Sequence, residues 1–115
     1  MKSGAQAEQT AARFLQRQGL QLVEANYRCR FGEIDLILRD GATLVFAEVR
    51  LRSRADFGGA AASIDARKQH KLILAAQHYL SRIAPVPPCR FDALLLAQAD
   101  DESAIEWVKG AFELG

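Results

Sequence analysis

Apolar and polar residues along the chain follow two spacings, one typical of helices and one typical of strands. Helical spacing holds over residues 4–18, where one side of the predicted helix collects Ala7, Ala11, Ala12, Phe14 and Leu15. Ser3 with Gln6 resembles a helix-capping pair, and Gly19 is a typical stop after a last turn. The chain is therefore predicted to begin with a helix.

A second helix is predicted over residues 63–83, before a proline-rich connection. Its apolar stripe is formed by Ile64, Leu72, Ala75, Ala76, Tyr79, Leu80 and Ile83. Lys68 lies between two members of this stripe, so it is either a lysine that reaches solvent from the stripe's edge or a functional one. His70 and His78 lie off the stripe without the spacing of a helical metal pair, so both are expected in solvent.

Strands are predicted over residues 21–30, 32–37, 46–50, 91–97 and 105–112. The second and third form a hairpin around the turn signal Asp40-Gly41, and the fourth is apolar enough to be buried on both faces. The order α-β-β-β-α-β-β predicts an α/β fold with a mixed central sheet flanked by helices. Residues 1–115 are short enough to form a single domain.

Carboxylates interrupt the apolar pattern of the predicted hairpin. A two-residue turn would place Asp35 opposite Phe46 and Glu33 opposite Glu48, so that Asp35 and Glu48 become diagonal neighbours roughly 7–8 Å apart. The other face, with Ile34, Leu36, Leu38, Val45, Ala47 and Val49, is predicted to be pure core. Because burying a charge is costly unless it is compensated, one hard divalent cation shared by the two acids would explain their position.

A further acid, Glu8, falls inside the apolar arc of the first helix. Two interpretations stay open for it. A carboxylate near a helix N-terminus is stabilised by the helix dipole, whereas an acid on the buried side also suits a functional site.

Composition narrows the class of protein. Half of the residues are hydrophobic and a quarter are charged, as in ordinary globular proteins, and no apolar run approaches the ~18 residues of a membrane span. No apolar signal-peptide core follows Met1, so a cytoplasmic location is expected. Cys29 and Cys89 lack a metal-binding spacing and are expected to be reduced thiols.

The net charge of +1 hides an asymmetry along the chain. Residues 1–90 carry 14 basic and 8 acidic side chains, whereas residues 91–115 carry 1 and 6. A basic region around buried acids suits an anionic substrate such as nucleic acid, although a charged surface in solvent has the same composition. Arg30, Arg52, Arg54 and Lys68 are the candidate contacts to backbone phosphates, which give affinity without sequence information.

Two motifs carry a resemblance to a known family. Residues 32–37, Gly-Glu-Ile-Asp-Leu-Ile, and residues 46–52, Phe-Ala-Glu-Val-Arg-Leu-Arg, resemble the central motifs of the YraN-like family, the second in the form F-V-E-V-K-x-R. Shorter matches are the pattern from Gly4 through Glu8 to Ala11, Phe57-Gly58, Lys68, Arg90-Phe91-Asp92 and Ala111-Phe112. That family is grouped with the restriction-endonuclease-like, PD-(D/E)XK superfamily, and is similar to Holliday-junction resolvases.

The resemblance implies a restriction-endonuclease-like fold and a role for each motif acid. Asp35 and Glu48 would bind Mg²⁺ or Mn²⁺, and Glu8 would be the additional acid that resolvase-like members bring from their first helix. Arg50 stands where the motif has lysine. An arginine stays protonated in proteins, so it can orient a phosphate or stabilise a transition state but cannot act as a base.

Three functions remain open at this level. The first is a metal-dependent DNA endonuclease that hydrolyses phosphodiesters, with branched DNA among its substrates and a homodimer as the acting form. The second is a nucleic-acid-binding module with a degenerate site on the same fold. The third is a structural or partner-binding protein without nucleic acid.

Overall fold

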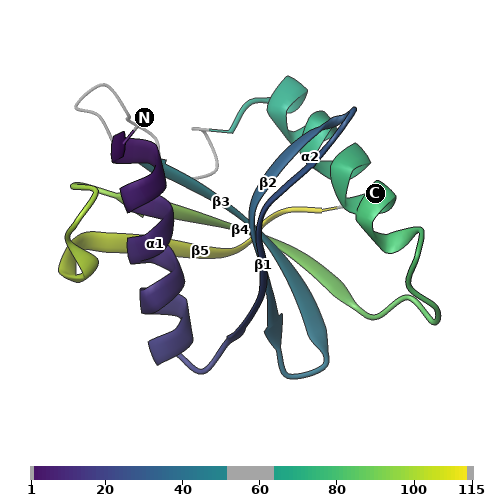
Figure 1. The fold of residues 1–115 in the computed structure, drawn as a ribbon, viewed down its shortest axis with the longest axis horizontal. Coiled ribbons are helices and arrows are strands. Elements are labelled where there is room, and N and C mark those ends of the chain that lie inside the picture. The colour runs from purple at the N-terminus through teal and green to yellow at the C-terminus, as the bar shows by residue number, and fades with distance from the viewer. Residues whose placement is uncertain (1, 52–63, 114–115) are drawn as a thin grey trace.

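The computed structural model describes residues 2–51 and 64–113. Along the chain the elements are α1 (Lys2–Arg17), β1 (Gln21–Cys29), β2 (Gly32–Asp40), β3 (Thr43–Leu51), α2 (Ala66–Leu80), β4 (Cys89–Leu96), the short 3₁₀ turn η2 (Glu102–Ala104) and β5 (Ile105–Phe112). The strands form one sheet in the order β1-β2-β3-β4-β5, antiparallel except for the parallel pair β3–β4. The predicted α/β class, mixed sheet and element order are confirmed (Figure 1).

Helix α1 covers one face of the sheet. The predicted side of this helix is buried there, together with strand residues that include Leu36, Val45 and Leu94. The helix already begins at Lys2, so the prediction that Ser3 caps it is wrong. Gly19 follows its end with a φ of +99°, a left-handed conformation that favours glycine and confirms the predicted stop.

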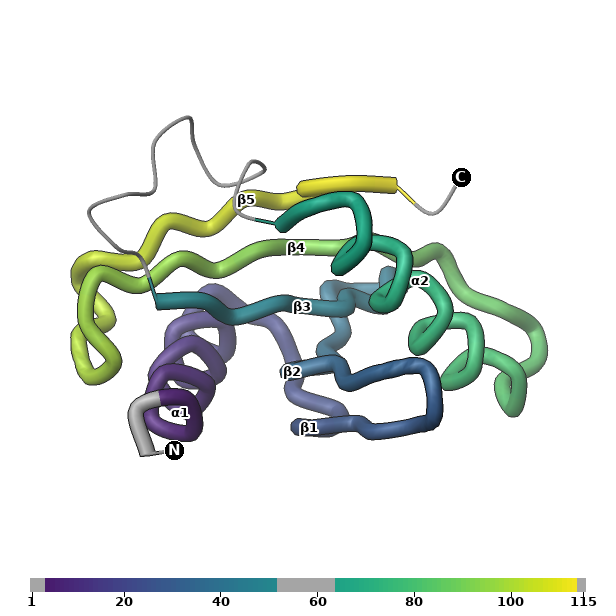
Figure 2. The backbone as a smooth tube through the Cα atoms, turned by 90° about the horizontal axis from the view of Figure 1, so that it is seen from above, coloured from purple at the N-terminus to yellow at the C-terminus, as the bar shows by residue number. Residues whose placement is uncertain are grey.

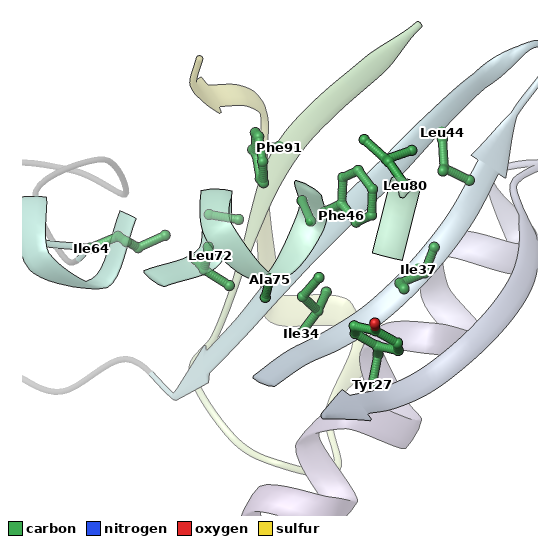
Figure 3. Close-up of a cluster of buried hydrophobic side chains, with 12 residues drawn as sticks. Tyr27, Ile34, Ile37, Leu44, Phe46, Ile64, Leu72, Ala75, Leu80 and Phe91 are labelled. Carbon is green, nitrogen blue, oxygen red and sulfur yellow. The ribbon is translucent and has the colours of Figure 1, made fainter. Parts of the chain in front are cut away.

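Helix α2 covers the opposite face and begins later than predicted. Asp65 is its N-cap, and the Asp65 side chain accepts the backbone N–H of Lys68 at 2.8 Å. The predicted stripe is buried against the sheet, as Figure 3 shows for Leu72, Ala75 and Leu80.

The prediction for His78, at the far end of α2, is wrong, whereas His70 is exposed as expected. His78 is half-buried, and its ring nitrogen Nδ1 hydrogen-bonds the Tyr27 hydroxyl group of β1. The helical spacing places His78 off the apolar stripe of α2, but β1 contacts α2 there and Tyr27 packs against the His78 ring.

The β2–β3 hairpin has a different register from the predicted one. Its turn is Gly41-Ala42, with a φ of +62° at Gly41, and Asp40 pairs with Thr43. Ile37 therefore lies opposite Phe46, where the prediction placed Asp35. Because the register moves by two residues, the faces of the β3 side chains are as predicted.

The two strands of this hairpin separate halfway along their length. Their pairing ends at Leu36 and Ala47; beyond that point β2 pairs only with β1, and β3 only with β4. Figures 1 and 2 show β1 and β2 turning toward α2 while β3 continues past α1. Ile34 packs on the α2 side and Leu36 on the α1 side, so the prediction that they share a face is wrong. The alternation breaks at Asp35, the residue between them.

Strands β4 and β5 complete the sheet. β4 is buried on both faces, as predicted, and its Asp92 is only 1% exposed. Trp107 of β5 packs edge-on against Phe14 of α1 and so anchors this end of the sheet. Within the described ranges, no helix is long and apolar enough to cross a membrane.

Candidate functional site

Asp35 occupies the fork where β2 leaves β3. Its Oδ2 atom accepts the backbone N–H of Val49 at 2.8 Å. Val49 lies just beyond the last β2–β3 pair, so the carboxylate takes the place of the missing backbone partner and holds the two strands at a fixed opening. The fork therefore positions Asp35 between the two faces of the sheet.

Glu48 lies one residue beyond the last pair on β3 and is only 6% exposed. Its Oε2 atom lies 3.4 Å from the Lys68 Nζ of α2. Its Oε1 atom is buried and, when both Glu48 and Asp35 are ionised, has no hydrogen-bond donor within the described part of the chain. A buried oxygen without a partner costs about 1–3 kcal/mol or more, and either a proton shared with a neighbouring carboxylate or a bound cation would satisfy it.

Two further acids complete the cluster. Carboxylate oxygens of Glu8, Glu33 and Asp35 all lie within 4.8 Å of one another. Glu8 comes from α1, so α1 contributes to the same cluster as β2. Glu33 also forms an exposed ion pair with Arg28 at 3.4 Å. Sequence reasoning did not assign Glu33 to the site, although it shares the motif of Asp35.

The clustered acids shift one another's protonation. Burial, repulsion from Asp35 and a hydrogen bond with it raise the pKa of Glu8 to about 7. Burial, repulsion from Asp35 and a hydrogen bond with it raise the pKa of Glu48 to about 7, although the Lys68 ammonium acts in the opposite direction. Burial also raises the pKa of Asp35, against the Val49 N–H that lowers it. At neutral pH the cluster therefore exchanges protons readily, and a divalent cation competes with those protons.

Asn26 of β1 is a neighbour that sequence reasoning missed. In the β1–β2 register, the residues on either side of Asn26 pair with those on either side of Asp35, and the Asn26 φ of +57° is left-handed in the middle of a strand. A hydrogen bond from the Asn26 side chain lowers the pKa of Glu8, against the shifts described above. The only signal in the sequence is that asparagine tolerates this backbone conformation better than most residues.

The donor atoms fit a hard divalent cation. Glu8, Glu33 and Asp35 offer carboxylate oxygens, which Mg²⁺ and Mn²⁺ prefer, and neither histidine nor cysteine joins this group among the described residues. Glu48 lies outside this group of three and is linked to it through its interaction with Asp35. The buried Oε1 atom of Glu48 without a partner is the feature that a cation would resolve most directly.

A polar hollow of about 490 Å³ opens beside Glu48. Arg50, two residues further along β3, lines it and has electrostatic partners of its own. The complete lining is Glu48, Val49, Arg50, Leu51, Asp65, Arg67, Lys68 and Lys71. The hollow thus joins the end of β3 to the first turns of α2.

The four predicted phosphate contacts have different surroundings. Lys68 pairs with Glu48, so its charge is already engaged at the site. Arg30 lies in the β1–β2 turn, with its guanidinium carbon 4.9 Å from the ring centre of Phe31. Arg52 and Arg54 lie outside the described residues.

The model of a protein family matches residues 7–96, described as "Uncharacterised protein family UPF0102". The chain belongs to this family. Among its UPF0102 relatives, the protein of Methylobacillus flagellatus is 58% identical over 109 residues, 95% of each chain. A Nitrosomonas europaea relative is 58% identical over 110 residues, 96% of this chain and 92% of its own. A relative from Dechloromonas aromatica is 57% identical over 109 residues, which are 95% of this chain and 87% of its own. The UPF0102 match includes Glu8, Asp35 and Glu48.

Proposed function

We propose that this UPF0102 protein is a metal-dependent endonuclease of the restriction-endonuclease-like, PD-(D/E)XK type, which hydrolyses phosphodiesters in DNA, branched DNA included. The observation that carries the proposal is the interaction of the buried Asp35 and Glu48 carboxyl groups at the strand fork, where one Glu48 oxygen has no donor among the described residues. Buried acids in such a position destabilise the fold unless an opposite charge, a hydrogen bond or a ligand compensates them. Phosphodiester hydrolysis is the reaction that a hard cation beside a basic hollow supports best.

Asp35 and Glu48 would hold Mg²⁺ or Mn²⁺, and Glu8 would complete the set of ligands from α1. A cation bound there polarises the phosphate oxygens and makes a coordinated water more acidic. Alternatively, if Glu8 does not coordinate the cation, its carboxylate could accept a proton from the coordinated water.

The cationic side chains of the site would act on the substrate. Arg50 lines the hollow beside Glu48, where a planar guanidinium can orient a phosphate and stabilise the charge that develops on it. It takes the place of the motif lysine without the ability to act as a base. Lys68 neutralises Glu48 until a cation or a phosphate competes for one of the two partners.

A second candidate function is a nucleic-acid-binding module that does not cleave. Two observations favour it: arginine occupies position 50, and the Lys68 ammonium already compensates Glu48 without any metal. In that case the buried acids would have no catalytic role and would be stabilised by shared protons and by Lys68, and only the basic surface would bind nucleic acid.

Calorimetric titration with Mn²⁺ tests the metal site. We expect one site in the parent protein, and loss of that site in Asp35→Asn and in Glu48→Gln. Asp100→Asn, which removes an exposed acid, is the matched control and should bind as the parent does. Equal binding by the parent and both site variants would overturn the assignment.

The proposed function includes a homodimer in the cytoplasm. Symmetric cleavage of two strands needs two active sites, and a pair of identical subunits supplies them. Light scattering on the protein with and without four-way-junction DNA measures this directly. A single subunit per junction would remove the dimer from the proposal.

A further inference from the structure

The first turns of α2 place three cations along one side of the hollow next to Glu48. Lys71 follows Lys68 by three residues and Arg67 by four, so both are its neighbours on the surface of the helix. All three line the hollow, together with Arg50 from β3. Four cationic side chains therefore surround a space whose acidic lining residues are Glu48 and Asp65.

Both of those acids already have partners on α2. Glu48 pairs with the Lys68 ammonium, and Asp65 accepts the backbone N–H of Lys68 as the helix cap. Arg67 and Lys71, in contrast, are exposed and form no ion pair or hydrogen bond with the residues that the structure describes. The described lining of the hollow therefore has four cationic side chains against two acidic ones, a formal excess of two positive charges.

The turn between β1 and β2 lies beside the same helix side. A side chain at Gly32, where β2 begins, would meet the Cβ of Lys71 at 3.7 Å. Arg30, in that turn, lies two residues before Gly32. Arg30 itself lies against Phe31, whose ring packs on His78 further along α2. The β1–β2 turn therefore borders α2 beside Lys71, and Arg30 is not among the described residues that line the hollow.

We propose that Arg67 and Lys71 bind a backbone phosphate of a nucleic-acid strand in this hollow, next to the phosphodiester that the acids would process. The inference rests on the proposed function for the identity of the strand, but not for metal or cleavage. A guanidinium and an ammonium facing one open space match a phosphate group, which accepts several charge-assisted hydrogen bonds. Lys68 is not part of the pair because Glu48 holds its ammonium.

Fluorescence anisotropy with a labelled duplex oligonucleotide, in EDTA and over a range of salt concentrations, tests this inference. We expect the double variant Arg67→Gln/Lys71→Gln to weaken binding roughly tenfold or more. The slope of log affinity against log salt should become shallower by about 1 unit, because one phosphate contact is lost. Arg82→Gln, which removes an exposed cation beyond the other end of α2, is the matched control and should change neither quantity.

Other outcomes separate this inference from the proposed nuclease. DNA binding that depends on Arg67 and Lys71 in EDTA, in a protein that cleaves nothing with Mn²⁺, would sustain the phosphate site and refute the nuclease. Equal affinity and slope in the parent and the double variant would overturn the phosphate site, as would a parent that does not bind DNA in EDTA. A parent protein that binds inorganic phosphate but not DNA would also overturn the phosphate site proposed for a nucleic-acid strand, because the hollow would then serve a free anion.

Discussion

Arg50 is the residue on which the choice between nuclease and binding module depends most. It lines the hollow two residues after Glu48, where a positive group faces the acids from β3. A guanidinium forks onto two oxygens of a phosphate, whereas a compact ammonium approaches a single water more closely. The identity of this one cation therefore affects the chemical step more than it affects the fold.

Arg50→Lys is expected to leave the melting temperature and Mn²⁺ affinity close to those of the parent and to raise the cleavage rate. Water-positioning groups contribute typically ~10²–10⁴-fold, so the gain should be visible in a gel assay. A slower Arg50→Lys would indicate that arginine is the working residue, and Arg50→Ala would then lose most of the activity. An unchanged rate in both variants would exclude any part for residue 50 in cleavage.

Single residues of the site differ in how far the sequence reveals them. Asp35 and Glu48 are conspicuous because they are acids among Ile, Leu, Val and Phe. Glu33 and Asn26 are not, because their place depends on the fork and on a left-handed backbone at Asn26. A regular two-strand pattern contains neither feature, so only the folded backbone brings these side chains to the acids.

At the scale of elements, a buried acid joins β4 to β5. Asp92 accepts two hydrogen bonds from Arg90, at 2.8 and 3.0 Å, one from the Trp107 ring at 3.0 Å and one from the Gly110 N–H at 3.0 Å. Every one of these donors lies on β4 or β5. Asp92 is thus buried like Glu48, but its carboxylate oxygens all have partners.

Replacing Asp92 with alanine should cost about 1–3 kcal/mol of unfolding free energy, because the Trp107 ring and the Gly110 N–H lose their acceptor. Arg90 keeps its ion pair with Asp40 at 3.1 Å. Asp92→Asn should cost less, since its amide oxygen still accepts hydrogen bonds. Urea unfolding of both variants beside Asp100→Asn measures the difference. A cost within about 0.5 kcal/mol for Asp92→Ala would contradict a structural role for this acid.

The elements themselves were predictable because their apolar spacing persists over many residues. Their register was not: the turn signal Asp40-Gly41 is compatible with two closures, and the chain uses Gly41-Ala42. The sequence also did not predict that the pairing of β2 with β3 ends at Leu36 and Ala47. Beyond these residues both strands stay largely apolar, and each pairs with another strand, β2 with β1 and β3 with β4. Sequence spacing specifies which residues are buried more firmly than it specifies what they pair with.

At the scale of the whole molecule, the acid cluster makes stability depend on pH. Glu8 and Glu48 titrate near pH 7 in the folded protein and near 4.5 when unfolded. Between these values the folded state binds more protons than the unfolded state. The free energy of unfolding should therefore fall as pH rises from about 4.5 to about 7, and the loss should be complete above 7.

Thermal denaturation between pH 5 and pH 8 checks this dependence. In EDTA the melting temperature should fall across the window, and saturating Mn²⁺ should restore it at pH 8, because the cation replaces the protons. Glu48→Gln removes one titrating group and should flatten the fall. A melting temperature that rises with pH in EDTA, in the parent protein, would refute the raised pKa values.

The most direct measurement for the whole account is cleavage of a panel of single-stranded, duplex, flap and four-way-junction DNA, with Mg²⁺ and with Mn²⁺. The account predicts cleavage of at least one substrate by the parent protein, abolished by EDTA and by Asp35→Asn, while Asp35→Asn still binds the DNA. Intact substrates in every lane, at protein concentrations that saturate binding, would contradict the nuclease proposal. Cleavage that persists in Asp35→Asn would contradict the site.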